Sequence, residues 1–246
     1  MEFTAQIPYG AYWATPLAKW QGSLSHLNSI EFGAHVAKAE LAKRGVEPEV
    51  FDYGVLGMTV PQHKSFQGLP WFMGMIGAPH VGGPTISQVC ATGARCIQDA
   101  VQNVECELAS VALVATVDRL SNGPQLYYPN PSGIGGAGCH ENLTVYNMQN
   151  DALGGHSMLQ CAENVAAKHQ ISTEEQHEMV IFRREQYEMA LTDNSAFLKR
   201  FMSLPFEVPS ANFRKTDSEM DGDEGVFTSD AEKLKKLKPV LEKGTV

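Results

Sequence analysis

The chain has 246 residues, of which 43% are hydrophobic, and a formal net charge of −9. This length accommodates one large domain or two small ones, and the composition is that of an ordinary globular protein. The acidic balance gives nucleic-acid binding no electrostatic support. No apolar run reaches the roughly 18 residues of a membrane-spanning helix.

Before residue 120 the sequence alternates between helical and strand patterns. Apolar side chains at steps of three and four predict a helix over residues 27–43, and a strand is predicted over residues 51–57. We interpret residues 61–83 as a polar and aromatic connection. Within it, the side chains of residues 71–75 either pack in the core or line a pocket.

Cys90 lies where a strand meets a helix. Residues 83–89 are β-prone, and residues 91–104 carry apolar side chains at helical steps. The positive end of the helix dipole favours a thiolate, which is the nucleophilic form of cysteine. The sequence therefore indicates a candidate nucleophile. The alternative is a buried structural cysteine, the interpretation that we give Cys96.

The remaining cysteines carry no local signature. With Cys90 and Cys96 they make an odd number, and no secretory leader is recognised. We therefore expect reduced thiols and a cytoplasmic location. No cysteine pair has the spacing of a zinc site, so we expect no metal. The three are Cys106, Cys139 and Cys161.

A near-continuous apolar run over residues 110–117 is typical of a strand buried on both faces of a parallel sheet. With the preceding strand and helix it forms a βαβ unit. We place a domain boundary near residue 120, because residues 121–156 are rich in Gly, Pro and Asn. Helices are predicted over residues 157–169 and 173–192, the second opened by a capping box.

Further short stretches complete the chain. Residues 204–227 are interpreted as short strands or loops, and residues 230–237 as a short helix. Residues 133–138 match GxGxxG, but no strand precedes them and no helix follows, so a flexible loop is favoured over a dinucleotide site. His140 and His156 are candidate bases for the Cys90 thiol, and solvent-exposed histidine is the alternative for both.

Several segments in this order resemble the thiolase family. The nucleophile motif V-C-[AS]-[ST]-G matches residues 89–93, and the family's first loop resembles residues 21–25. The segment M-G-x-T-A-E-N-V-A resembles residues 158–166. The segment L-x-x-L-[KR]-P-x-F followed by G-T-V resembles residues 234–240 and 244–246. The resemblance covers nearly the whole chain.

The resemblance implies an α/β fold in two parts. Residues 1–120 form a thiolase-like N-terminal domain with a mixed, mainly parallel sheet covered by helices. Residues 121–246 form a mostly helical loop domain that covers coenzyme A and leads into a C-terminal domain. The Gly-His-Pro and Cys-Gly-Gly motifs of that second half are absent from the sequence. The chain thus resembles a first half, either as a fragment or as a natural subunit.

The resemblance also implies an acyl-CoA C-acyltransferase of fatty acid metabolism. Cys90 carries the acyl group in a Claisen condensation of acyl-CoAs or in thiolytic cleavage of a 3-ketoacyl-CoA. The implied partners are the acyl-CoA substrate, and further copies of the chain or a C-terminal half that supplies a histidine and a cysteine. No resident cofactor, nucleic acid or membrane is expected.

Four residues are the implied contacts to coenzyme A: Ser157, Met158, Phe227 and Lys233. Met158 matches a methionine that touches the pantetheine arm, whereas Phe227 replaces an arginine near the nucleotide end. The loop over residues 63–72 also lacks a family arginine. These departures keep open a second hypothesis, a subunit that binds acyl-CoA or a partner chain without catalysis. A nicotinamide-binding protein using the GxGxxG glycines is the third.

Overall fold

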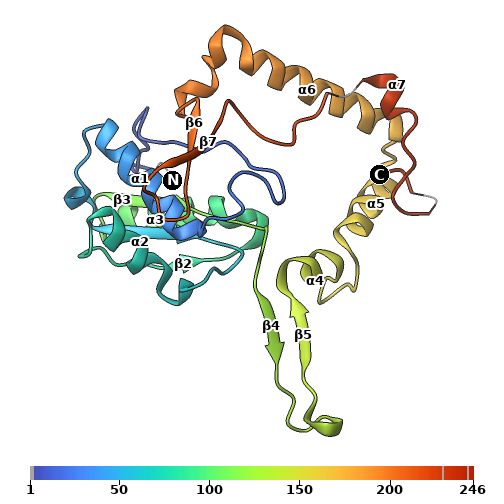
Figure 1. Cartoon of the computed structure of the whole chain (residues 1–246), viewed down its shortest axis with the longest axis horizontal. Helices are drawn as coiled ribbons and strands as arrows, with labels where there is room; N and C mark the ends of the chain where they lie inside the picture. Colours follow the sequence, from blue (N-terminus) through green and yellow to red (C-terminus); the bar gives the residue numbers. More distant parts are fainter. Residues whose placement is uncertain (1–2, 229, 243) are drawn as a thin grey trace.

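The computed structural model describes residues 3–228, 230–242 and 244–246. It consists of a parallel sheet flanked by helices, and a long excursion that leaves this body and returns to it (Figure 1). The helices are α1 (Ser29–Lys43), α2 (Gly68–Ile76), α3 (Thr92–Glu105), α4 (Leu143–Gln149), α5 (Met158–His169), α6 (Thr173–Ser195) and α7 (Ala231–Leu234). The strands are β1 (Tyr53–Gly57), β2 (Thr85–Ile86), β3 (Ala112–Thr116), β4 (Gln125–Tyr128), β5 (Cys139–Asn142), β6 (Phe206–Pro209) and β7 (Thr216–Met220).

The main sheet has the strand order β2-β1-β3, and both strand pairs are parallel. The predicted βαβ unit is confirmed as β2, α3 and β3, although β2 is much shorter than the β-prone run suggested. The central strand β1 is buried over four of its five residues. This burial is expected for a strand that has neighbours on both sides and helices on both faces.

The sheet lies between two helical layers. On one face α1 and α2 build the main core, whose buried members include Ile30, Leu56, Leu69, Phe72, Met73, Ile76 and Leu113. On the other face α3 packs Cys96 and Ala100 against Val55 of β1. The result is the predicted α/β fold.

Helix α2 lies within residues 61–83, which the sequence analysis interprets as a polar and aromatic connection. That expectation was wrong, because the segment 68–76 is helical and packs against α1 and β1. Phe72 and Met73 are only 1% and 0% exposed. Phe72 and Met73 are therefore core residues, and Trp71 and Met75 pack against the core, although Met75 also lines a hollow with His35 and Phe213.

Helix α3 has two apolar faces. Thr92, Cys96 and Ala100 face the sheet and are buried. The predicted stripe lies elsewhere on the helix: Ala94 and Ile97 are exposed, and Val101 and Val104 are half-buried. The side of α3 turned away from the sheet is thus apolar and largely uncovered in this chain.

The excursion begins after β3 with the antiparallel hairpin β4–β5, which projects away from the body (Figure 1). Helices α4, α5 and α6 follow, and the predicted capping box of α6 is confirmed between Ser172 and Glu175. No helix in the described part of the chain has the length and apolar character needed to cross a membrane.

The chain returns to the body through the antiparallel hairpin β6–β7. Phe206, Val208 and Met220 of this hairpin pack on Val36 of α1 in a second buried cluster. The hairpin thus joins the second half of the sequence to the first. The division into two domains near residue 120 stays a prediction.

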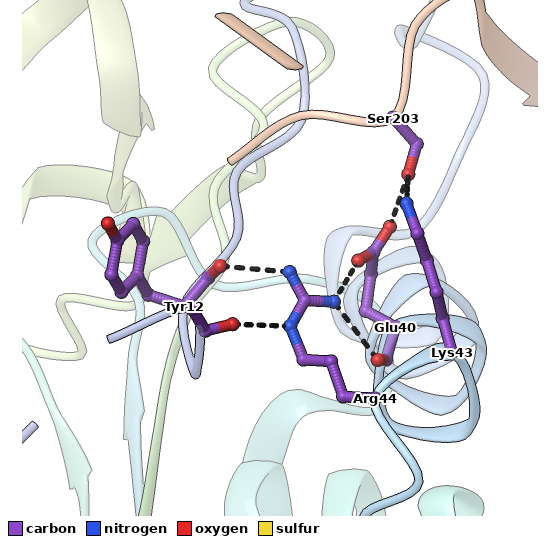
Figure 2. A network of polar contacts seen from close by, with 6 residues as sticks. Tyr12, Glu40, Lys43, Arg44 and Ser203 are labelled. Atoms are coloured by element: carbon purple, nitrogen blue, oxygen red, sulfur yellow. Dashed lines mark hydrogen bonds and ion pairs between the residues drawn. The ribbon is translucent and has the colours of Figure 1, made fainter. Parts of the chain in front are cut away.

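A polar network holds three segments together at the C-terminal end of α1 (Figure 2). Arg44 pairs with Glu40 and donates a hydrogen bond to the carbonyl oxygen of Tyr12 at 3.0 Å. Ser203, on the returning segment, donates to Glu40 at 2.6 Å and accepts from Lys43 at 3.0 Å. The network therefore ties the N-terminal segment and the returning chain to one helix.

This network predicts a pH-dependent stability. Burial raises the pKa of Glu40, but hydrogen bonds from Ser203 and Arg44, with the charges of Arg44 and Lys43, outweigh burial and lower it below 4.5. The unfolded state then binds this proton more readily than the native state. The stabilisation is therefore present above the unfolded pKa and is lost as the pH falls through the lower native value.

We expect Glu40→Gln to remove this part of the pH dependence. The free energy of unfolding, measured by urea titration at several pH values, should differ most between wild type and Glu40→Gln near neutral pH. The difference should shrink as the pH falls from about 5 to about 3. A difference that stays constant over this range contradicts the prediction.

Candidate functional site

Cys90 occupies the 3-10 turn Val89–Ala91, between β2 and α3, and its side chain is exposed. The predicted strand-to-helix turn is therefore confirmed. The turn follows the carboxyl end of a parallel strand, the sheet edge at which α/β proteins bind their ligands. Its role as nucleophile stays a prediction.

The N-terminus of α3 has no side-chain cap among the described residues, since its N-cap residue is Ala91. The first N–H groups of a helix have no partner within the helix, and they carry the positive end of its dipole. The N–H of Thr92 already donates to the carbonyl oxygen of Val89, but the positive end of the dipole still favours an anionic group beside Cys90. A thioester oxygen that becomes negatively charged on attack is such a group.

Cys96 differs from Cys90 in every respect that matters for reactivity. It is 0% exposed and packs under α3 against the sheet. Burial raises the pKa of its thiol, and the charge of Asp99 raises it further. Cys96 is therefore a packing residue, as predicted. Cys106 and Cys139 are exposed, and Cys161 is half-buried.

Of the four predicted coenzyme A contacts, Ser157 and Met158 lie on the excursion, whereas Phe227 and Lys233 lie on the segment after the β6–β7 hairpin. Ser157 caps α5 by accepting a hydrogen bond from the N–H of Gln160, and the neighbouring Met158 is 55% exposed. Phe227 is 76% exposed, and the Lys233 side chain pairs with Asp230 at 3.1 Å. All four contact roles stay predictions.

Met158 lines an apolar hollow of about 430 Å³ between α5 and the start of α6. Cys161, Val165, Ala166 and Ile171 form its walls. Cys90 does not line this hollow. The candidate nucleophile and the candidate pantetheine contact therefore do not meet in this hollow.

The GxGxxG match and the two histidines do not form a second site. Residues 133–138 lie in the connection of the β4–β5 hairpin, without the strand and helix that a dinucleotide fingerprint requires. His140 and His156 are exposed, as their alternative interpretation predicted. The described residues contain no cluster of three or more side chains that could hold a metal ion.

A carboxylate clamp joins the segment after the β6–β7 hairpin to the N-terminal loop 17–23, and sequence reasoning missed it. Glu224 accepts hydrogen bonds from the N–H and hydroxyl groups of Ser23 and from the N–H of Lys19. Asp223 accepts from the N–H of Leu17 at 2.7 Å. The hydrogen bond from Ser23 is the main cause of the lowered pKa of Glu224. This clamp fixes the segment that leads into Phe227.

The chain is similar to known proteins over nearly its whole length. Residues 11–246 match the family described as thiolase, N-terminal domain. Acetyl-CoA acetyltransferase IA of Candida tropicalis is 31% identical over 94% of this chain and 58% of its own length. Acetyl-CoA acetyltransferase 1 of Arabidopsis thaliana is 29% identical over 92% of this chain and 54% of its own length.

A solved structure agrees with this. The crystal structure of human mitochondrial 3-ketoacyl-CoA thiolase superposes with a TM-score of 0.81 at 26% identity, over 94% of this chain and 58% of that chain. This chain therefore spans a little over half the length of the relatives that it matches.

Proposed function

Because this chain belongs to the thiolase family, whose N-terminal domain it matches over residues 11–246, we propose that it forms the nucleophile-bearing half of an acyl-CoA C-acyltransferase. The observation that carries this proposal is the exposed Cys90 on the uncapped N-terminus of α3. The names of its relatives, acetyl-CoA acetyltransferase and 3-ketoacyl-CoA thiolase, are consistent with an acyl-CoA substrate.

The proposed reaction begins with attack of the Cys90 sulfur on the thioester carbonyl carbon of an acyl-CoA. A bond forms between Cys90 and the acyl group, the bond to the coenzyme A sulfur breaks, and coenzyme A leaves as a thiolate. The positive end of the α3 dipole stabilises the oxygen that becomes negatively charged. A second acyl-CoA then loses a proton from the carbon next to its carbonyl to a base of the C-terminal half. That carbon bonds to the acyl group as the bond to the Cys90 sulfur breaks, and cleavage of a 3-ketoacyl-CoA is the reverse.

We place coenzyme A along the excursion and the segment after the β6–β7 hairpin. In this proposal Ser157 and Met158 contact the pantetheine arm, and Met158 does so from the edge of the apolar hollow on α5. Lys233 binds a phosphate of coenzyme A, and its exposed ion pair with Asp230 breaks when it does so. Phe227 presents an exposed apolar ring where the family has an arginine, so we propose weaker affinity for the nucleotide end.

The proposed activity needs a second protein surface. The outer side of α3 exposes Ala94 and Ile97, and it lies on the helix that begins beside Cys90. An apolar helix face of this kind is expected to be covered in the working protein. We propose that a C-terminal thiolase half covers it, and that the assembly contains more than one copy of this chain. Fatty acid metabolism in the cytoplasm remains part of the proposal.

A catalytically incomplete subunit that binds acyl-CoA or a partner chain is the second candidate. The separation of Cys90 from the hollow beside Met158 favours it. The two functions differ in one observable: only the acyltransferase forms a covalent bond between Cys90 and an acyl group.

Alkylation by iodoacetamide tests the nucleophile. Cys106 is the matched control, because it is exposed at the opposite end of α3. We expect Cys90 to react about tenfold faster than Cys106 at neutral pH, measured by peptide mass spectrometry, since a helix start favours the reactive thiolate. In a separate sample that has not been alkylated, incubation with acetyl-CoA should place an acetyl group on Cys90. Equal rates at the two cysteines in the assembled protein reject the proposal.

A further inference from the structure

The residue before Cys90 has an unusual backbone conformation. Val89 has φ of +48°, in the left-handed region. A β-branched residue rarely adopts this conformation, because its side chain crowds the backbone. The Val89 side chain is also 67% exposed, so burial of its methyl groups does not account for the conformation. Another interaction must therefore hold the turn in place.

The hydroxyl group of Thr92 supplies that interaction. It accepts a hydrogen bond from the N–H of Gln88 at 2.8 Å, and it donates one to the carbonyl oxygen of Val89 at 2.7 Å. The two hydrogen bonds connect Gln88 and Val89 to the first turn of α3. The hydroxyl group therefore adds two hydrogen bonds to the two backbone ones that close this turn, from the N–H of Ala91 to Gln88 and from the N–H of Thr92 to Val89.

Thr92 is itself fixed by the sheet. It is 6% exposed, and a Cβ atom added at Gly57 of β1 would lie 2.9 Å from its methyl carbon. The same added atom would lie 2.8 Å from the sulfur of Cys96. The absence of a side chain at Gly57 thus lets the start of α3 approach β1. The methyl group of Thr92 anchors to the sheet while its hydroxyl group faces the turn.

We propose that Thr92 is a positioning residue, which holds Val89 in its left-handed conformation and so presents Cys90 outward at the start of α3. The inference rests on the proposed function, since it assigns a purpose to the exposure of Cys90. It explains why two cysteines six residues apart have opposite environments: Cys96 points into the sheet face, and Cys90 lies on a turn held away from it.

The test compares Thr92→Val with Thr92→Ser. Valine keeps the shape and the methyl contact with β1 but loses both hydrogen bonds, whereas serine keeps the hydroxyl group. We expect Thr92→Val to slow alkylation of Cys90 by about three- to tenfold, the effect of losing roughly one net hydrogen bond. Thr92→Ser should restore the rate to within about twofold of wild type. Cys106 should react equally in all three proteins.

Two further measurements separate positioning from general destabilisation. Amide hydrogen exchange at Gln88 should be faster in Thr92→Val and normal in Thr92→Ser, because its N–H partner is the hydroxyl group. In a Val89→Gly background, Thr92→Val should have a smaller effect on the Cys90 rate, since glycine adopts positive φ without crowding.

The outcomes are distinct. One outcome is that Cys90 is alkylated faster than Cys106 in wild type, but Thr92→Val changes neither the alkylation rate of Cys90 nor the amide hydrogen exchange at Gln88. The positioning role is then overturned, and the proposed function stands. If Cys90 never outpaces Cys106, while Gln88 exchange still responds to Thr92→Val, the proposed function fails and the turn closure stands. An equal decrease in the alkylation rate of Cys90 in Thr92→Val and Thr92→Ser also overturns the role of the hydroxyl group.

Discussion

Replacement of Cys90 by alanine is expected to abolish acyl transfer by the assembled enzyme. The acyl group has no other exposed thiol at a helix start to which it can pass among the described residues. Cys96 is buried, Cys161 in the first turn of α5 is half-buried, Cys106 follows the end of α3, and Cys139 lies in β5. Loss of a nucleophile in a covalent mechanism lowers kcat by about 10⁴-fold or more. Thioester exchange between acetyl-CoA and free coenzyme A measures this step without a second acyl substrate.

Cys106→Ala is the matched control for this prediction. Cys106 is exposed and lies at the other end of the same helix, so its loss should leave the exchange rate within about twofold of wild type. If Cys90→Ala retains a covalently bound acyl group at a comparable rate, another residue is the nucleophile.

The largest expected effect on stability comes from Phe72→Ala. The Phe72 ring is 1% exposed and lies in the main core formed by α1, α2 and the sheet. Truncation of a buried phenylalanine leaves a cavity and costs about 3–5 kcal/mol of unfolding free energy. Urea denaturation followed by circular dichroism measures the change.

Phe66→Ala provides the comparison, since Phe66 is 100% exposed and lies just before the same helix. Its loss should change the unfolding free energy by less than about 0.5 kcal/mol. Similar losses for the two variants would show that the Phe72 ring is not part of a packed core.

Local signals predicted the elements that depend on neighbouring residues. The capping box at Ser172 and Glu175 marked the start of α6, and the apolar run over residues 110–117 marked β3. The turn at Cys90 was found for the same reason, because a strand pattern and a helix pattern meet there. Each signal lies within a few residues of the feature that it predicts.

Other features depend on contacts between distant residues, and the sequence did not reveal them. Helix α2 contains Gly68, Pro70 and Gly74 in an almost wholly apolar segment, so it lacks the polar face that marks a surface helix. The positioning of Thr92 depends on Gly57 of another strand, and the clamp at Glu224 depends on Ser23. No local pattern connects such pairs.

The N-terminal loop 17–23 holds both ends of the excursion. The N–H of Gln21 donates to Ser121 where the chain leaves the body, and Glu224 binds Ser23 near the point of return. Between these anchors Ser203 and the β6–β7 hairpin also contact α1, so changes in length that spare the contacts with the body are those before Ser203. Evolution can therefore remodel the excursion as a replaceable module, provided that the loop that fastens both of its ends is retained.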